Sequence, residues 1–313
     1  MLMDLEFETA FMGNYSKFAG DLIRSARIPI LPSPEFNSWN HAAVPHYLAA
    51  GAGVMLDSYQ LTADRLSKVS RVLVESPLCV LDDFAEHKRY DCDGLINFTV
   101  SAKSRIYPEG PAKLFLGPEF FPARRWLREV RTARQSQDKR VPQPQNFLVI
   151  AGGNDREGVT LRLLSALSRI SPQAHVCVLT AAAANQDLEK VLSGFSTVNR
   201  LKFCPDLREP MLWADACLCG GGLTKYECAF VGLPVAALAQ TAEQQADTEV
   251  LASAGAAFDL GLSRLTTDED LEARLRLYVT DCTSLKRQID CGRQLVGARN
   301  PQRVAEPFLQ LVS

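Results

Sequence analysis

The stretch ADACLCGGGLTKYECAFVGLPVAALA (214–239) contains a complete strand–turn–helix–strand unit. Its first six residues, 214–219, are a short apolar run typical of a buried strand, and they lead directly into three glycines at 220–222. The pattern at 223–231 predicts a helix, which the following Gly-Leu-Pro ends. A second apolar run follows at 234–239. Strands that alternate with helices in this way predict a parallel α/β sheet.

The same alternation extends through the rest of the chain in both directions. Short apolar runs bounded by turn residues predict the strands, and apolar residues at helical spacing predict the helices. Further strands are predicted at 5–12, 28–31, 54–57, 77–83, 94–97, 113–117, 147–151, 175–180 and 199–203. Further helices are predicted at 18–26, 62–73, 122–134, 159–170, 267–279, 283–295 and 301–312.

A polar segment divides this pattern into two halves. Residues 135–146, QSQDKRVPQPQN, combine polar side chains with prolines, which interrupt both helix and strand periodicities. The strand and helix pattern restarts after this linker. We therefore expect an N-terminal α/β domain at 1–134 and a C-terminal α/β domain at 147–313, with a cleft between them.

Composition and charge exclude several classes of protein. The 313 residues are 47% hydrophobic and 22% charged, which is the mixture of a globular protein, and the formal net charge is −2 at pH 7. A chain so close to neutral has no global field to attract nucleic acid or an anionic membrane. No apolar run reaches the roughly 18 residues of a membrane span, and the first residues are acidic where a signal peptide is basic. These features predict a cytoplasmic protein.

The nine cysteines are an odd number and contain no C-x-x-C pair. Several of them lie within apolar runs. Cys217 and Cys219 would point in the same direction from a strand, which is a poor arrangement for a metal without other ligands nearby. We therefore expect reduced cysteines that pack as small hydrophobic residues, with no metal site and no cofactor.

The glycines at 220–222 are the best local indication of a binding site. Glycines at the carboxyl end of a parallel strand let a ligand approach the backbone closely, and the next helix offers free N–H groups to a diphosphate. Thr224 could add a hydroxyl donor, and the carboxylate of Glu227 could accept both hydroxyls of a ribose. The alternative is a capping box, in which Thr224 and Glu227 only satisfy the helix end. The spacing is not G-x-G-x-x-G, which disfavours a Rossmann dinucleotide site.

A second glycine loop, Gly152-Gly153-Asn154-Asp155, follows the predicted strand at 147–151. Two glycines after a strand are common in ordinary turns. Two such loops in one α/β domain nevertheless favour a nucleotide site, because both strands end at the same edge of the sheet.

In the N-terminal half, polar side chains follow two predicted strands, at 57–59 and at 82–83. The acidic pair at 82–83 has the alternative interpretation of turn or cap residues. His41 and His46 flank a proline in a loop that leads into a helix, and from there a general base could reach a cleft. Ordinary surface histidines fit the same pattern.

These pieces, in this order, resemble the pseudaminic-acid-pathway UDP-sugar hydrolases, which remove UDP from a 2,4-diacetamido-trideoxy sugar nucleotide. The resemblance implies a GT-B-like α/β fold, with two Rossmann-like domains and an interdomain cleft. It also implies a C-terminal half similar to that of the glycosyltransferase making lipid II. It is carried by LDSYQL (56–61), LDDFAEHKRYDCDGLIN (81–97), LFLGPEF (114–120), AGGNDREGVTLRLLSAL (151–167), ADACLCGGGLTKYECAFVGLPVAAL (214–238) and EQQADTEVLASAGAAF (243–258).

The resemblance also implies roles for individual residues. Glu227 matches the family's ribose-binding glutamate, Tyr59 matches a tyrosine at the sugar site, and Gln244 matches a glutamine near the sugar. The expected UDP-binding residues are Gly153, Asn154, Phe203, Cys204, Gly221, Gly222, Thr224 and Glu227. The candidate catalytic residues are Tyr59, His41, His46 and Asp155.

The chain departs from the family pattern at three places. It has no G-x-G-H-x-x-R loop, whose histidine is the family's proposed base, and its first strand corresponds to the family's second. Asn154 replaces the usual Ser or Thr, and Glu243 replaces the Asn that precedes Gln244. A protein partner or an upstream segment is therefore expected to complete the N-terminal domain.

The function that the resemblance implies is hydrolysis of a UDP-sugar in nonulosonic-acid or surface-polysaccharide biosynthesis. Water would attack the anomeric carbon and UDP would leave, stabilised by helix N-termini. One alternative is a glycosyltransferase of the same fold, in which a sugar hydroxyl replaces water. Another is a catalytically silent subunit that binds a UDP-sugar.

Overall fold

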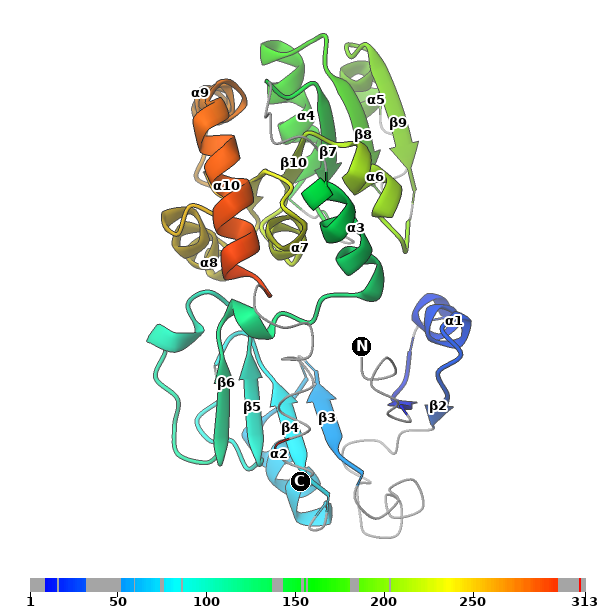
Figure 1. The fold of residues 1–313 in the computed structure, drawn as a ribbon, viewed down its shortest axis with the longest axis vertical. Helices are drawn as coiled ribbons and strands as arrows, with labels where there is room; N and C mark the ends of the chain where they lie inside the picture. Colours follow the sequence, from blue (N-terminus) through cyan, green and yellow to red (C-terminus); the bar gives the residue numbers. More distant parts are fainter. Residues whose placement is uncertain are drawn as a thin grey trace. The chain divides into compact units, whose positions relative to one another are not determined.

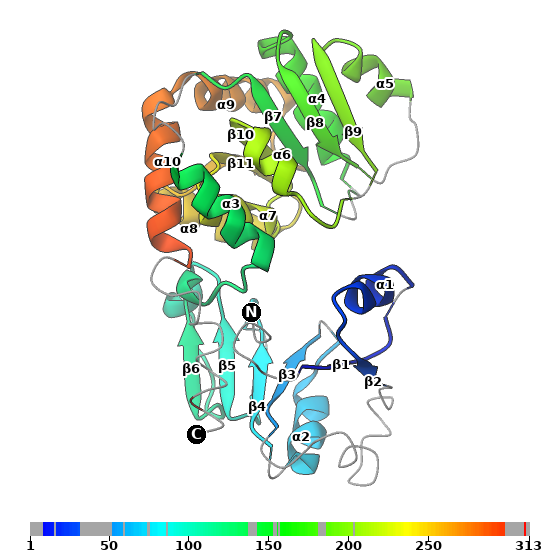
Figure 2. The same ribbon diagram turned by 45° about the vertical axis from the view of Figure 1, so that its right-hand side comes forward.

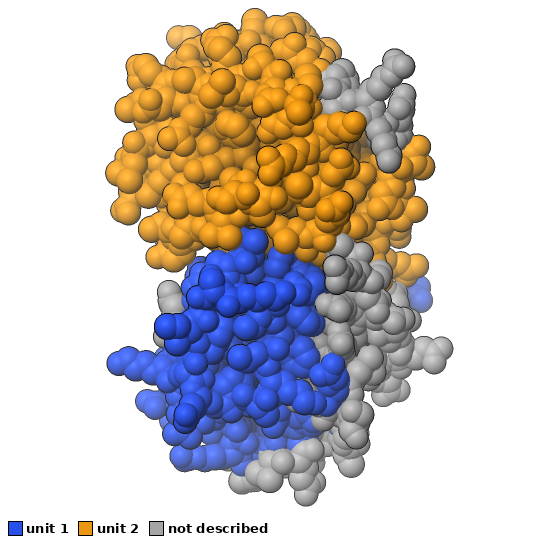
Figure 3. Space-filling model, turned by 60° about the vertical axis from the view of Figure 1, so that its left-hand side comes forward, with its two compact units in different colours: residues 1–122, 300–313 blue, residues 123–299 orange. Residues whose placement is uncertain are grey.

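The protein divides into two compact units (Figure 3). The N-terminal unit comprises residues 1–122 and 300–313, and the C-terminal unit comprises 123–299. The structure is a computed structural model. It describes residues 9–15, 17–31, 52–58, 60–73, 76–85, 87–136, 143–152, 155, 157–180, 186–202, 204–297 and 310.

The C-terminal unit is built on a six-stranded parallel sheet in the order β12-β11-β10-β7-β8-β9 (Figures 1 and 2). Nearly all residues of its central strands are buried, as the continuous apolar runs predicted. The strands are β7 (Asn146–Ile150), β8 (His175–Leu179), β9 (Thr197–Leu201), β10 (Ala216–Cys219), β11 (Val235–Ala239) and β12 (Phe258–Leu262).

The helices of this unit cover both faces of the sheet. From β7 the chain runs outward through β8 and β9, then returns to β10 on the other side of β7 and continues to β11 and β12. Because crossovers between parallel strands are almost always right-handed, the two directions place their helices on opposite faces. The helices are α3 (Arg125–Ser136), α4 (Val159–Ile170), α5 (Gln186–Leu192), α6 (Arg208–Trp213), α7 (Thr224–Val231), α8 (Ala242–Ser253), α9 (Asp268–Thr280) and α10 (Cys282–Leu295).

The N-terminal unit contains a four-stranded parallel sheet in sequential order, β3 (Val54–Asp57), β4 (Leu78–Leu81), β5 (Gly94–Asn97) and β6 (Lys113–Leu116). Helix α2 (Ala63–Val72) buries Leu66 and Val69 in the core beside this sheet. A separate two-stranded parallel sheet pairs β1 (Phe11–Met12) with β2 (Ile30–Leu31), joined by α1 (Lys17–Ser25). Two short 3₁₀ helices are η3 (Ala102–Ser104) and η4 (Pro118–Phe120).

The position of α3 corrects the expected domain boundary. The sequence assigned this helix to the end of the N-terminal domain, but the compact units divide at 122/123, and α3 packs on α6 and α7. Arg131 donates hydrogen bonds to the carbonyl oxygens of Phe230 and Arg293, both at 2.8 Å. Arg134 donates to the carbonyls of Met211 and Gly232. These arginines satisfy the carboxyl ends of helices in the C-terminal unit, and so they hold α3 there.

The parallel α/β class predicted from the sequence is confirmed, and several elements have the predicted bounds, among them β3, β5 and α4. The α-helices and strands that were not predicted are α5, α6, α8 and β12, and the 3₁₀ helices η3 and η4 were not predicted either. The helix predicted at 301–312 lies outside the described residues, apart from residue 310.

Candidate functional site

The candidate site lies at the carboxyl ends of β7 and β10, where the direction of the sheet reverses. These two strands are neighbours, with Cys219 opposite Ile150, and the amide of Gly220 donates to the carbonyl of Ile150 at 3.2 Å. The helices that follow β7 and β10 diverge to opposite faces of the sheet, which leaves the strand ends uncovered by either helix. In open α/β sheets this topological switch point is where ligands bind.

Two of the three glycines in the turn after β10 are required by packing. A Cβ atom on Gly220 would lie 2.6 Å from the carbonyl oxygen of Ala151. Gly221 has a φ of +79°, and its Cβ would lie 2.9 Å from the Cα of Ala239. Gly222 differs, because a Cβ there would meet no atom of the described residues within 4 Å. The turn is therefore packed tightly underneath and open at Gly222.

Helix α7 begins without a side-chain cap. Its N-cap residue is Leu223, which provides no capping hydrogen bond, and Thr224 is already the first helical residue. The capping-box alternative is therefore wrong. Within the described part of the chain, the backbone amides of Gly222, Leu223 and Thr224 have no hydrogen-bond acceptor. Such a helix end, with its free N–H groups and positive dipole, suits an anionic ligand.

Glu227 points its carboxylate into a largely buried position one turn into α7. The side chain is 12% exposed, and this burial raises the pKa of its carboxyl above the ordinary value. The nearest cation is the exposed guanidinium of Arg124, whose Nε lies 4.0 Å from Oε1. Among the described residues, no group donates a hydrogen bond to this carboxylate. A buried carboxylate in that state is well suited to accept hydroxyl groups from a ligand.

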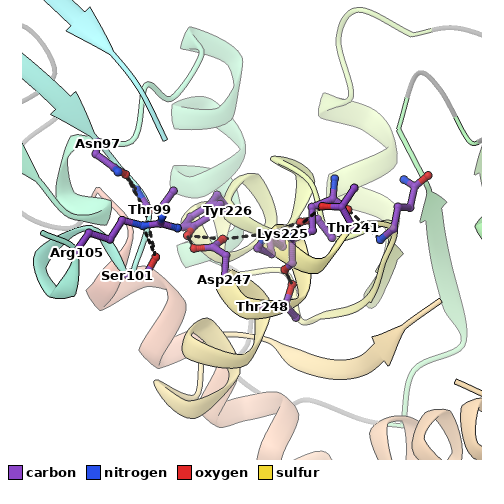
Figure 4. A network of polar contacts seen from close by, with 12 residues as sticks. Asn97, Thr99, Ser101, Arg105, Lys225, Tyr226, Thr241, Asp247 and Thr248 are labelled. Carbon is purple, nitrogen blue, oxygen red and sulfur yellow. Dashed lines mark hydrogen bonds and ion pairs between the residues drawn. The ribbon is translucent and has the colours of Figure 1, made fainter. Parts of the chain in front are cut away.

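A buried polar network lies directly beneath the turn (Figure 4). The Lys225 ammonium, 3% exposed, lies 3.0 Å from Oδ2 of Asp247 and donates to the carbonyl oxygen of Gly221. The Tyr226 hydroxyl lies 2.8 Å from each carboxylate oxygen of Asp247. This ion pair was not anticipated from the sequence. Lys225 stands between Thr224 and Tyr226 in the sequence, and this local pattern does not reveal its partner on α8.

Gln244, the predicted sugar-binding residue, lies beside Gly221. Its Oε1 accepts a hydrogen bond from the amide of Gln240 at 3.0 Å, and it is 3.3 Å from the position of a Cβ on Gly221. The side chain of Gln240 donates in turn to the carbonyl of Ala151 at 2.7 Å. These two hydrogen bonds connect the start of α8 to the residues that follow β11 and β7. The structure thus brings together five predicted residues: Gly221, Gly222, Thr224, Glu227 and Gln244.

Asp155, a candidate catalytic residue, has a structural role at the start of α4. Its Oδ1 accepts a hydrogen bond from the amide of Val159 at 2.7 Å, and its Oδ2 accepts one from the amide of Thr160 at 2.9 Å. The carboxylate therefore satisfies the first amides of α4. Both oxygens are engaged by the helix, which explains the residue at this position without a catalytic function.

The remaining candidates divide into one described residue and several that are not. The thiol of Cys204 is partly exposed and donates to the carbonyl of Asp206, at 2.7 Å between Sγ and O. The candidates that lie outside the described residues are His41, His46, Tyr59, Gly153, Asn154 and Phe203.

In the N-terminal unit, Asp82 is the centre of a second polar cluster after β4. Its Oδ1 accepts the amides of Phe84 and Ala85, which is the turn role that the sequence left open. Its Oδ2 accepts the hydroxyl of Tyr90 at 2.6 Å and lies 3.7 Å from Nε2 of His87. This carboxylate is saturated by its own loop.

The described residues offer neither a cluster of metal ligands, nor a disulfide bond, nor a helix that could span a membrane. These residues contain no group of three or more His, Cys, Asp or Glu side chains that could hold a metal ion. All nine cysteines are free thiols. None of the described helices is long and apolar enough to cross a membrane.

Comparison of the sequence with known proteins finds a curated relative, but no protein-family model matches the chain. The spore coat polysaccharide biosynthesis protein SpsG of Bacillus subtilis (strain 168) is 28% identical over 209 residues, which are 64% of this chain and 60% of that protein. The chain thus matches about 60% of the length of this curated relative.

Two solved structures resemble the chain over nearly its whole length. The spinosyn forosaminyltransferase SpnP has a TM-score of 0.66 at 12% identity, covering 99% of this chain and 93% of its own. LpCGTa in complex with UDP has a TM-score of 0.61 at 12% identity, covering 96% and 91%. The GT-B-like fold with two Rossmann-like domains is thereby confirmed. The more specific resemblance to pseudaminic-acid hydrolases stays a prediction.

Proposed function

We propose that the protein is a UDP-sugar-dependent enzyme of polysaccharide biosynthesis, and that it transfers the sugar to an acceptor hydroxyl. Three similarities support the proposal. The curated relative is named for spore coat polysaccharide biosynthesis, one structural neighbour is a forosaminyltransferase, and another holds UDP. These favour transfer over the hydrolysis that the sequence motifs suggested.

The observation that carries the proposal is the uncapped start of α7 beside the buried carboxylate of Glu227. Three amides at the start of α7, which have no acceptor among the described residues, match the oxygens of a diphosphate. A carboxylate four residues into α7, buried and without a donor, matches the two hydroxyls of a ribose. The two features together select a nucleoside diphosphate over a simple anion.

In the proposed reaction, the bond between the anomeric carbon and the diphosphate oxygen breaks. The oxygen of an acceptor hydroxyl bonds to that carbon, the hydroxyl proton passes to a base, and UDP leaves. The α7 amides would stabilise the charge that grows on the departing diphosphate, because they are fixed in place before the reaction. Asp155 is not assigned a catalytic part, since both its oxygens bond α4.

Product analysis tests the proposal and separates its alternatives. The protein would be incubated with a panel of UDP-sugars, with and without oligosaccharide acceptors, and UDP and free sugar would be measured. Transfer predicts UDP release that depends on an acceptor, together with a lengthened acceptor. Equal amounts of UDP and free sugar without acceptor would instead establish the hydrolase that motifs such as LDDFAEHKRYDCDGLIN suggest. Binding without turnover would indicate a silent subunit that needs a partner.

A further inference from the structure

The ion pair between Lys225 and Asp247 is an unusual feature of the C-terminal unit. Both charged groups are nearly excluded from water, with side chains 3% and 10% exposed, and the ammonium also bonds the carbonyl oxygen of Gly221 (Figure 4). Desolvation of two charges is expensive, and well-packed apolar residues often stabilise a fold as well as a buried pair does. The pair therefore requires an explanation other than stability.

The position of the ammonium determines which way one peptide group faces. In a trans peptide the C=O and the following N–H point in opposite directions. Lys225 holds the carbonyl of Gly221 toward the interior, so the amide of Gly222 is directed away from Lys225. That amide is one of the three at the start of α7 that lack an acceptor among the described residues.

We propose that Lys225 is a positioning residue for the diphosphate, acting through the Gly221–Gly222 peptide. The ammonium fixes that peptide with its N–H outward and polarises it, which makes the N–H a stronger donor. Asp247 orients the ammonium and partly offsets its charge, and Tyr226 holds Asp247 in place. The inference rests on the proposed function, because it concerns the phosphate part of the same nucleotide site.

The test compares UDP with uridine, which lacks the phosphates, by titration calorimetry on the whole chain. The measured quantity is the preference for UDP, that is, the ratio of the uridine Kd to the UDP Kd. Lys225→Met removes the charge and should lower the preference roughly tenfold, with uridine affinity little changed. Asp247→Asn keeps the ammonium and removes its counter-charge, so the preference should stay equal to the parent's or rise.

Two further variants separate this role from folding stability. The double variant Lys225→Met/Asp247→Asn removes both charges of the pair, so neither is left without the other. It should fold even where Lys225→Met alone does not, and its UDP preference should still be low. Gln288→Leu is the matched control. Gln288 is also 3% exposed, and its Oε1 accepts the amide of Val235 at the opposite end of β11. Loss of the Gln288 amide should reduce the stability of the fold without changing the preference for UDP over uridine.

Each outcome has a distinct meaning. A lower preference in Lys225→Met, together with a parental or higher preference in Asp247→Asn, would support the positioning role. Equal losses in both variants, or a parental preference in the double variant, would overturn it and leave a purely structural pair. A parent protein that binds neither UDP nor uridine would overturn the nucleotide site itself, and with it this inference.

Discussion

Helices α4 and α7 follow adjacent strands that each lead into a glycine-containing segment of sequence, yet their first amides are in opposite states. At α4, the carboxylate of Asp155 accepts the amides of Val159 and Thr160. At α7, no side chain caps the helix, and the described residues offer the amides of Gly222 to Thr224 no acceptor. One helix end is capped by its own chain, and the other is uncapped among the described residues.

The difference shows that a glycine loop before a helix does not identify an anion site by itself. The decisive property is whether the protein supplies its own anion to the helix end. Asp155 does so at α4, whereas at α7 the nearest carboxylate, Glu227, lies too far into the helix to cap it. Four predictions follow from this contrast between a closed and an open helix end.

The largest expected effect is on nucleotide binding, from loss of the Glu227 carboxylate. Glu227→Ala removes a charge-assisted contact to the ribose, which should weaken UDP binding by about 2 kcal/mol, roughly 30-fold. Titration calorimetry measures the change, and the thermal unfolding temperature serves as the fold control. Parental UDP affinity in the variant would mean that α7 presents no ribose site.

A methyl group at Gly222 should close the open helix end. Gly222→Ala places the Cβ where no atom of the described residues lies within 4 Å, so folding stability should be unchanged or up to about 1 kcal/mol higher. The same methyl lies beside the free amides and should reduce UDP affinity roughly tenfold, because glycine permits the closest approach of a ligand to the backbone.

Gly221→Ala is the matched comparison for that experiment. With a φ of +79° and Ala239 at 2.9 Å from the added Cβ, it should lose stability as well as affinity. A Gly222→Ala variant that binds UDP as tightly as the parent would place the diphosphate elsewhere.

At the start of α4, which Asp155 caps, we expect the reverse of the effects at Gly222: stability should fall and UDP affinity should be retained. Asp155→Ala removes both capping hydrogen bonds of α4 and should lower the free energy of unfolding by about 1 kcal/mol, a shift of roughly 2–4 °C in Tm. UDP affinity should change less than about twofold, since the residue is engaged by its helix. A large fall in kcat without loss of stability would show that Asp155 takes part in catalysis.

The sequence could predict where these turns lie but not which of them is open. Local patterns determined the bounds of α4 and the strands before both turns, because apolar periodicity and glycines act over a few residues. The hydrogen bonds of the Asp155 carboxylate to the first amides of α4 depend on its position in three dimensions. The Lys225–Asp247 pair joins two different helices, and the contacts of Arg131 join segments about a hundred residues apart. Such contacts have no local signature.

The smallest expected effect is a pH dependence that the two helix ends should not share. Burial raises the pKa of Glu227 above its ordinary 4.5, so the folded protein binds this proton more tightly than the unfolded chain does. The stability contribution of Glu227 is therefore greatest below pH 4.5 and is lost as pH rises through the raised pKa. Ligand binding has the opposite requirement, because the ionised carboxylate is the stronger acceptor for ribose hydroxyls.

Uridine is the appropriate probe for this dependence, since it carries no phosphate that titrates in the same range. Its affinity for the parent should rise roughly threefold as pH increases through the raised pKa of Glu227, while thermal stability declines over the same interval. Glu227→Gln should flatten both curves, because the amide does not titrate. Asp155→Asn should leave the uridine curve of the parent intact. A pH dependence of uridine binding that survives Glu227→Gln would assign the titrating group to another residue and separate Glu227 from the ribose.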